Sequence, residues 1–404
     1  MRGDRIQLDK MKQNINKLVY CCGCGGCETV CPVKCISLLQ DANGFWRAFC
    51  EEKWCVHCGK CLKVCPFVQK KEKLGEIPLH VYAAVSKNEE FYRRSASGGM
   101  FSQLAEWVIE MHHGTVWGCM LDEKLKAVHR YVESMEELDK LRRSKYVQSD
   151  TRGVFAIVKQ QLEAGRHVLF VGTPCQVNGV RRYLGREYNN FFAVDILCHG
   201  VPSPGMFERH IQYLQKKHHG MLTGFEFRQK RYQNEKTYHV TYLLGKAREK
   251  YLPFYRDAYY NAFYHLESLA ESCYVCPYAS ERRCGDITLG DYAWAKKWHP
   301  EFSAYEEISC VLINTEKGLQ LFETVAPGLI CRPTRLEYVM MNNEALCRPT
   351  KRPAYRDKIY QEMRNCYARW AGHYFHSLRY IRQWRIWLPL KWIKQALKKC
   401  KSKF

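Results

Sequence analysis

The chain has 404 residues, including 22 cysteines, and a formal net charge of +22 at neutral pH. This length allows two or three domains with a large core. So many cysteines in a long chain indicate metal ligation in a reducing compartment and argue against a disulfide scaffold. Residues 1–20 lack an apolar signal-peptide core, and no apolar run is long enough to span a bilayer. A cytoplasmic location is therefore expected.

The basic excess is concentrated at the C-terminal end. From Lys351 to Phe404, 15 Lys and Arg residues stand against Asp357 and Glu362, which leaves +13 in this segment and +9 in the first 350 residues. Nucleic-acid binding is the third-ranked interpretation of this charge, because no nucleic-acid-binding motif accompanies it.

One spacing of cysteines occurs twice near the N-terminus, each time followed by a proline: Cys21, Cys24, Cys27 and Cys31 before Pro32, and Cys55, Cys58, Cys61 and Cys65 before Pro66. The pattern C-x-x-C-x-x-C-x-x-x-C-P is the ligand spacing of ferredoxins that hold two 4Fe-4S clusters, where the last cysteine of each set ligates the other cluster. The expected ligand sets are Cys21, Cys24, Cys27 and Cys65 for the first cluster, and Cys31, Cys55, Cys58 and Cys61 for the second. We therefore predict a two-cluster ferredoxin-like domain over residues 1–70.

Zinc is the main alternative for these cysteines. Zinc sites use two C-x-x-C pairs with a longer gap, or cysteine mixed with histidine, and neither produces this doubled pattern. Cys22, Cys35 and Cys50 fall outside the register, and we expect them to be small buried residues near the clusters.

A lysine-rich connector over residues 69–78 ends the first domain, and apolar periodicity then predicts alternating elements. The predicted strands are 80–86, 115–120, 127–132, 167–171, 191–197, 222–228 and 237–244, with one more after residue 308. The predicted helices are 101–112, 135–143, 151–164, 177–184 and 255–266, with others after 204 and before 323. Such alternation favours an α/β core that binds ligands at the carboxyl ends of its strands. Neither a G-x-G-x-x-G motif nor a P-loop occurs.

Three short stretches carry candidate chemistry. The turn from Arg93 to Gly99 joins arginines, serines and two glycines at a helix start, which suits an anion or a simple helix cap. Cys175 stands at a strand-to-helix junction, where a thiolate is stabilised. Cys273 and Cys276 form a C-x-x-C that alone could be redox-active or half of a zinc site.

Four separated stretches together resemble one family, the beta subunits of coenzyme F420 hydrogenases and dehydrogenases, whose relatives include plant hydroxymethyl-chlorophyll a reductase and bacterial divinyl-chlorophyllide reductase. They are residues 94–99, 172–176, 195–204 (which contains Cys-His-Gly-Val-Pro-Ser-Pro) and 273–291 (C-x-x-C, then Asp-Ile-Thr-x-Gly-Asp). One departure is Tyr292-Ala293-Trp294, where relatives usually continue with Asp-Phe-Trp-Gly. The last 80 or so residues match no part of the family.

The resemblance implies an FAD-binding domain over residues 79–345 that carries a third 4Fe-4S cluster. Its implied cluster ligands are Cys175, Cys198, Cys273 and Cys276, with Cys284 as a spare cysteine. Its implied FAD contacts are Ser95, Ser97, Gly98, Gly99, Gly172 and Thr173. His199 could donate a proton to a substrate, although a loop histidine that holds the Cys198 turn by a hydrogen bond is the commoner role.

The segment 350–404 is predicted to be a basic, aromatic-rich helical tail. Residues 370–404 contain nine Lys or Arg, no acid and four tryptophans. This composition suits peripheral contact with the inner face of a membrane, and it equally suits docking on a partner or on the protein's own body.

The leading hypothesis is an iron-sulfur flavoprotein oxidoreductase that relays electrons from 4Fe-4S clusters through FAD to an unidentified small molecule or a deazaflavin-type coenzyme. Its expected partner is a redox protein, either a ferredoxin or a dehydrogenase or reductase subunit. A second hypothesis is an electron-transfer adaptor with no substrate of its own. A third is a zinc protein that binds nucleic acid.

Overall fold

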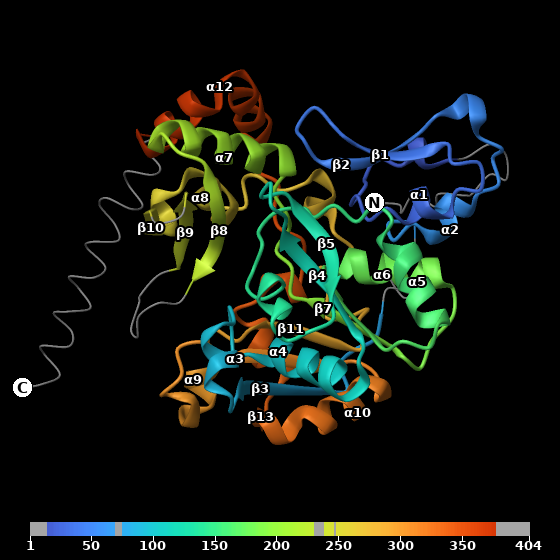
Figure 1. Ribbon diagram of the computed structural model, residues 1–404, viewed down its shortest axis with the longest axis vertical. Helices are drawn as coiled ribbons and strands as arrows, with labels where there is room; N and C mark the ends of the chain where they lie inside the picture. Colours follow the sequence, from blue (N-terminus) through green and yellow to red (C-terminus); the bar gives the residue numbers. More distant parts are fainter. Residues whose placement is uncertain (1–13, 69–74, 230–237, 246–247, 377–404) are drawn as a thin grey trace, which may run out of the picture.

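The computed structural model describes residues 14–68, 75–229, 238–245 and 248–376 (Figure 1). The chain forms a small N-terminal module, a large mixed sheet with helices on both faces, and a three-stranded sheet beside it. This arrangement confirms the predicted combination of a small cysteine-rich module with an α/β body.

The repeated cysteine sequence produces a repeated backbone. Helices α1 (Gly26–Val30) and α2 (Lys60–Val64) each begin after a glycine in the left-handed region, Gly25 with φ 76° and Gly59 with φ 69°. Each helix ends at a cysteine with extended backbone, because the proline that follows disfavours helical geometry at the preceding residue. Strands β1 (Ile36–Gln40) and β2 (Trp46–Cys50) form an antiparallel hairpin between the two repeats.

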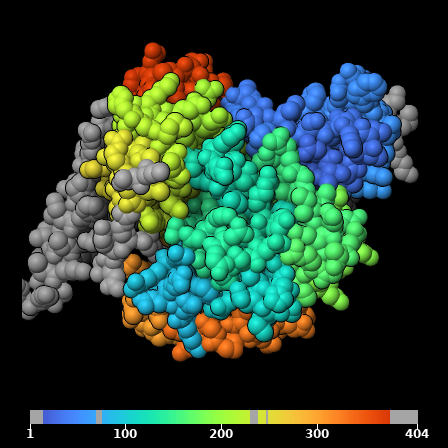
Figure 2. All heavy atoms as spheres, in the orientation of Figure 1, coloured from blue at the N-terminus to red at the C-terminus, as the bar shows by residue number. Residues whose placement is uncertain are grey.

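The module is fastened to the body at both ends. At the hairpin tip, Gly205 N donates to Gly44 O at 3.1 Å and Ser203 Oγ donates to Asn43 O at 2.6 Å. At the cysteine loops, α1 contacts helices α5 (Val154–Glu163) and α6 (Pro174–Leu184), and α2 contacts α6. In Figure 2 the blue module lies directly against the green residues of these two helices.

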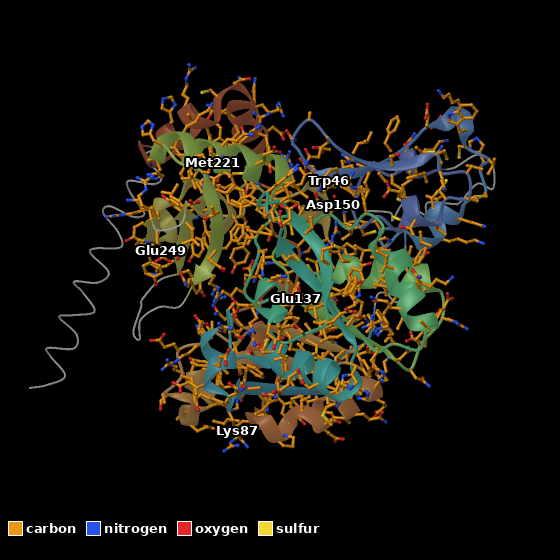
Figure 3. All side chains as sticks on the ribbon, viewed as in Figure 1. Trp46, Lys87, Glu137, Asp150, Met221 and Glu249 are labelled. Atoms are coloured by element: carbon orange, nitrogen blue, oxygen red, sulfur yellow. The ribbon has the colours of Figure 1, made fainter. Side chains whose placement is uncertain are left out.

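A second group of contacts joins the side of the hairpin to the loop after residue 144. Trp46 N donates to Gln148 Oε1 at 2.8 Å, and Gln148 Nε2 donates to Cys22 O at 2.9 Å. The guanidinium of Arg152 lies 4.4 Å from the centre of the Trp46 ring and is ion-paired with Asp150. Trp46 and Asp150 are neighbours in Figure 3.

The large sheet has the order β13-β3-β12-β11-β7-β6-β4-β5. Its strands are β3 (His80–Ser86), β4 (Thr115–Leu121), β5 (Ala127–Val132), β6 (Val168–Gly172), β7 (Phe191–Ile196), β11 (Ile287–Asp291), β12 (Ser309–Ile313) and β13 (Leu329–Pro333). Neighbouring strands pair in parallel from β11 through β7 and β6 to β4, and the other neighbours pair antiparallel, so the sheet is mixed. The carboxyl ends of these four central strands meet at one edge.

Both faces of the large sheet are covered. One face packs on α4 (Met100–Glu106), its π-helical continuation Trp107–Met111, and α10 (Glu316–Val325). The other face packs on α5 and α6 over the central strands, and on α9 (Ala295–Trp298) and α11 (Leu336–Met340) over β3 and β12. Helix α3 (Glu89–Arg93) precedes α4.

Two predicted elements differ from the structure. Residues 135–143 contain only a short 3-10 turn, Glu137–Lys140, because Leu138 and Leu141 alone bury apolar side chains there. Helix α6 begins at Pro174 rather than at residue 177, since proline is well suited to a first helical turn. Cys175 therefore lies inside the first turn of the helix.

The smaller sheet contains β8 (Leu222–Gln229), β9 (His239–Leu244) and β10 (Arg248–Pro253). It shares a core with α7 (Pro204–His218), α8 (Ala258–Tyr264) and α12 (Arg356–His376). Tyr360, Met363, Tyr367 and Trp370 of α12 are buried in that core, and the helix is interrupted at Cys366, whose backbone is non-helical.

The described part of the predicted tail thus packs on the protein's own body. The rest of the tail, residues 377–404, lies outside the described residues, so its predicted membrane contact stays a prediction. Among the described helices, none is both long and apolar enough to cross a bilayer.

Candidate functional site

The structure gathers the eight N-terminal cysteines into two cavities. The first is lined by Cys21, Cys24, Cys27 and Cys65, and the second by Cys31, Cys55, Cys58 and Cys61. Each cavity therefore holds three cysteines of one repeat and the last cysteine of the other. These are the two groups that the spacing of the repeat predicts.

The donors in these cavities fit iron-sulfur clusters. Among the described residues that line them, none is a carboxylate, and the first cavity is otherwise lined mainly by apolar groups such as Ile15 and Leu38. The backbone amides of Gly23 and Ala48 point at Cys21 Sγ, with N···S distances of 3.3 and 3.5 Å. Thiolate ligands with amide donors to sulfur suit a 4Fe-4S cluster.

Burial keeps several of these thiols neutral in the absence of metal. It raises the pKa of Cys65 to about 12 and also raises the pKa of Cys21, Cys27 and Cys61. Because thiolates are the metal ligands, binding iron must displace these protons.

A third group of cysteines lies where the parallel strands end. A cavity of about 360 Å³ is lined by Cys175 from α6, Cys198 after β7, and Cys273 and Cys276 from the loop before β11. Burial raises the pKa of Cys198 and of Cys276 to about 12, and raises that of Cys273 further. All four implied ligands of the third cluster thus face one cavity.

Close packing of two loops brings Cys198 and Cys273 together. Val201 O accepts a hydrogen bond from Ala270 N at 3.0 Å, and Pro202 forms a bridge with Leu269. Gly200 has φ 116°, and a Cβ atom there would lie 3.1 Å from Cys273 Cβ. Only glycine meets both requirements at this position.

A buried ion pair fixes the loop that carries the C-x-x-C. Arg283 Nη2 donates to Asp195 Oδ1 at 3.1 Å, and both side chains are at most 1% exposed. Asp195 also accepts the amides of Cys284 and Gly285, while Arg283 Nη1 donates to Tyr278 O. Asp195 is at the end of β7, so the network attaches the loop to the sheet.

Cys284 belongs to this network. Its thiol lies 3.1 Å from Pro174 O and 3.3 Å from Asp195 Oδ2, and it does not line the cavity. The structure therefore separates Cys284 from the other four cysteines.

The same cavity extends to most of the predicted FAD contacts. Ser95, Ser97, Gly99, Gly172 and Thr173 line it. Gly98 does not line it: its amide donates to Ser309 Oγ at 2.9 Å, and a Cβ atom at this position would clash with Ala84 O in strand β3. The buried oxygens Ser95 Oγ and Asn343 Oδ1 have no partner among the described atoms, so this wall offers polar groups to a ligand.

His199 lines the cavity next to Cys198. The cavity walls displace water from the imidazole and lower its pKa, although the carboxylates of Asp291 and Glu344 oppose this change. A neutral imidazole can accept a proton or share a hydrogen bond with a ligand. Its assignment as a catalytic residue stays a prediction.

Cys22 is the functional residue that sequence reasoning missed. It lines both the first cysteine cavity and the large cavity, and its side chain is hydrogen-bonded to Cys24 and Cys175. The hydrogen bond from Cys22 is the main cause of the lowered pKa of Cys175, and Thr173 Oγ1, 3.2 Å from the same sulfur, adds to it. The sequence contained one indication of this role, because Cys22 directly follows Cys21, a predicted cluster ligand.

Basic residues in the cavity were also missed. Arg93 and Arg94, which flank the predicted anion turn, form surface ion pairs with Glu89 and Glu90. The cavity is lined instead by Arg143, Lys145, Arg228 and Arg348, which come from segments without any recognisable motif.

Comparison with known proteins finds a family match for the segment that supplies the four implied cluster ligands of this cavity. Residues 165–331 match the family model for the C terminus of the beta subunit in coenzyme F420 hydrogenase/dehydrogenase. The family resemblance is confirmed over this segment.

The segment that matches the F420 hydrogenase/dehydrogenase beta-subunit family runs from the start of β6 into β13. It contains three of the four motifs on which the resemblance was based, and all four implied ligands of the third cluster. A search of curated proteins found no match.

One similar solved structure is a chain of the F420-reducing [NiFe] hydrogenase complex from Methanosarcina barkeri, studied by xenon derivatization. The two chains are 14% identical with a TM-score of 0.43, and the match covers 76% of this chain and 94% of that chain.

Proposed function

We propose that this protein is an iron-sulfur flavoprotein oxidoreductase. It receives electrons from a redox partner protein and delivers them, by way of FAD, to a small organic molecule. When bound, 4Fe-4S clusters carry single electrons and FAD collects two, which an organic substrate requires. A deazaflavin-type coenzyme, the class for which the matching family is named, is one candidate substrate.

The observation that carries this proposal is the continuity of the cavities. Cys22 borders the first N-terminal cavity and the large cavity, and the large cavity joins four cysteines to the serine-rich turn before α4. The first N-terminal cysteine set therefore adjoins the cavity that holds the third set, and that cavity also contains the unpaired oxygens of Ser95 and Asn343.

The residues of the large cavity have separate roles in this proposal. Cys175, Cys198, Cys273 and Cys276 hold the third cluster. Ser95, Ser97, Gly99, Gly172 and Thr173 contact FAD. Arg143 and Arg348, which line the same cavity and pair with Glu226 and Glu344, supply positive charge for its diphosphate. His199 faces the substrate and can exchange a proton with it.

The test is anaerobic purification followed by iron analysis, EPR and release of flavin on denaturation. Three cubane clusters predict about twelve irons per chain. In Cys273→Ser we expect a loss of about four irons, with the N-terminal pair retained. Cys284→Ser is the matched control, and we expect it to keep all of its iron because Cys284 lies outside the cavity.

The outcomes separate the alternatives. Zinc without iron would reject the proposal. Iron and flavin without turnover of any small molecule would favour an electron-transfer adaptor. An unchanged iron content in Cys273→Ser would remove Cys273 from the ligand set.

A further inference from the structure

The second N-terminal cavity contains one thiol more than a 4Fe-4S cluster needs. Besides Cys31, Cys55, Cys58 and Cys61, it is lined by Cys35. The Sγ atoms of Cys31 and Cys35 are 3.5 Å apart. Cys35 therefore presents its sulfur beside the ligand that the other repeat supplies.

The backbone around Cys35 is fixed by the hairpin. Glu51 N donates to Cys35 O at 2.8 Å, and Ile36 pairs with Cys50 across the strands. Asn16 holds Cys50 from the other side through two hydrogen bonds of 2.8 Å. With the backbone held, only rotation of the Cys35 side chain is needed to exchange its sulfur with that of Cys31.

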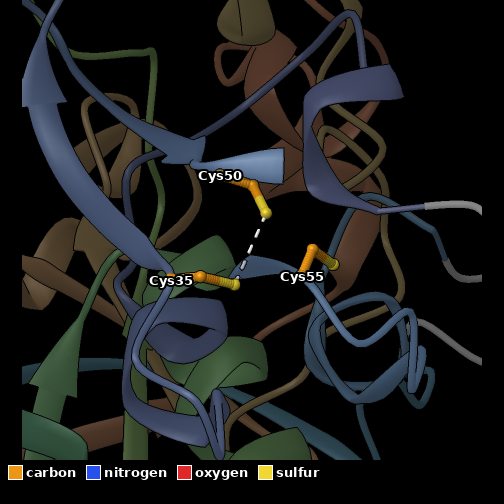
Figure 4. A group of neighbouring side chains, drawn as sticks. All are labelled: Cys35, Cys50 and Cys55. Carbon is orange, nitrogen blue, oxygen red and sulfur yellow. Dashed lines mark hydrogen bonds between the residues drawn. The ribbon is translucent and has the colours of Figure 1, made fainter. Parts of the chain in front are cut away.

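A further thiol orients Cys35. Cys50 Sγ lies 3.7 Å from Cys35 Sγ, as the dashed line in Figure 4 shows. The sulfur atoms of Cys35, Cys50 and Cys55 all lie within 4.8 Å of one another. Through Cys35 and Cys50, close sulfur–sulfur contacts therefore run from Cys31 to Cys55.

The first cavity has no equivalent arrangement. Its extra thiol, Cys22, is hydrogen-bonded to Cys24 and Cys175, toward the large sheet, and not to Cys65, which holds the position equivalent to Cys31. The second cavity also lies nearer to solvent, since Cys58 is exposed and Cys31 and Cys55 are half-buried. Solvent access makes thiolate ligands susceptible to oxidation.

We propose that Cys35 is a reserve ligand for the iron that Cys31 binds in the second cluster. In the exchange, the Fe–S bond to Cys31 breaks and an Fe–S bond to Cys35 forms. The thiol proton of Cys35 passes to the released Cys31 sulfur, and no electron is gained or lost. This inference depends on the N-terminal cluster pair of the proposed function, but not on the third cluster or FAD.

The test compares iron content and EPR spectra of the full chain after anaerobic reconstitution. Alanine is used because a serine oxygen could itself bind iron. We expect Cys31→Ala to keep the iron content of the wild type and its 4Fe-4S signals. We expect the double variant Cys31→Ala/Cys35→Ala to lose at least one iron, as should Cys65→Ala in the first cavity. Equal iron contents in the single and double Cys31 variants would overturn the proposal.

A second measurement does not require the Cys31 variant to fold. Oxidation of the holoprotein with ferricyanide should produce more 3Fe-4S signal in Cys35→Ala than in wild type. Cys347→Ala, an exposed cysteine outside the N-terminal module, is the control and should behave as wild type. Equal 3Fe-4S signals in Cys35→Ala and wild type would also reject the reserve ligand. A wild-type chain without N-terminal clusters would instead reject the proposed function.

Discussion

Cys22 and Cys175 are hydrogen-bonded through their side chains across the boundary between the N-terminal module and the large sheet. Cys175 is a proposed ligand of the third cluster, and Cys22 is outside every ligand set. Hydrogen bonds to cluster sulfur stabilise the more negative, reduced cluster and so raise its reduction potential. We therefore expect Cys22 to tune the potential of a proposed cluster next to it.

We expect Cys22→Ala to keep its iron and to lower the potential of an adjoining cluster by tens of millivolts, because one weak hydrogen bond is lost. An EPR-monitored redox titration measures this change. Cys331→Ala, on β13, is the control, and identical potentials in Cys22→Ala and wild type would contradict the prediction.

The Asp195–Arg283 pair provides a stability prediction. Asp195→Ala leaves a buried guanidinium and two buried amides without their acceptor, so we expect a loss of about 3–5 kcal/mol in the free energy of unfolding. Urea unfolding measures the loss. The exposed Glu187, which pairs with Arg181, offers the control, since Glu187→Ala should change stability by about 0.5 kcal/mol or less. Similar losses of unfolding free energy in Asp195→Ala and Glu187→Ala would show that burial does not make the Asp195–Arg283 pair more important for stability.

His129 predicts an acid-sensitive stability. Its side chain is buried and packs on Phe170, and burial lowers its pKa from 6.5 to about 4. Between pH 6.5 and about pH 4, His129 binds a proton in the unfolded chain but not in the folded chain. The folded state therefore loses stability as pH falls through this range. The loss should reach about 3 kcal/mol near pH 4. Urea unfolding at pH 7 and pH 4.5 should show a smaller loss in His129→Leu, and equal losses would argue against this prediction.

Two helical glycines provide a matched pair. A Cβ atom at Gly179 of α6 would lie 3.1 Å from Cys24 Sγ, whereas one at Gly372 of α12 would meet nothing within 4 Å. Gly372→Ala should stabilise the protein by up to about 1 kcal/mol through helix propensity. Gly179→Ala should not show this increase in stability, and it should bind less iron in the first cavity. Thermal unfolding and iron analysis would test both, and similar results for the two variants would be evidence against the contact with Cys24.

The sequence was most informative where local chemistry decides the structure. The doubled cysteine spacing predicted which cysteines share each cavity, because the glycine before each helix and the proline after it impose the same backbone twice. Strand β3 was also predicted from its apolar run, since most of its residues are buried between helices on both faces of the sheet.

Long-range contacts could not be predicted in the same way. Nothing near Cys22 in the sequence indicates that it meets Cys175, and Arg228 and Arg348 reach the cavity from segments without a motif. The turn from Arg93 to Gly99 illustrates the same point, because Ser95, Ser97 and Gly99 line the cavity, whereas Arg93 and Arg94 pair with the neighbouring Glu89 and Glu90 at the surface. The partners of a charged side chain depend on the tertiary fold as well as on its neighbours in sequence.

The attachment of the N-terminal module at both its hairpin tip and its cysteine loops has a kinetic consequence. A ferredoxin domain on a flexible tether must swing to its acceptor, so its electron transfer slows as solvent viscosity increases. Here the contacts of Gly44 with Gly205 and of α1 with α6 hold the N-terminal module against the body, so the proposed donor and acceptor clusters would keep a constant separation. Intramolecular transfer should consequently proceed at the same rate in dilute buffer and in concentrated glycerol.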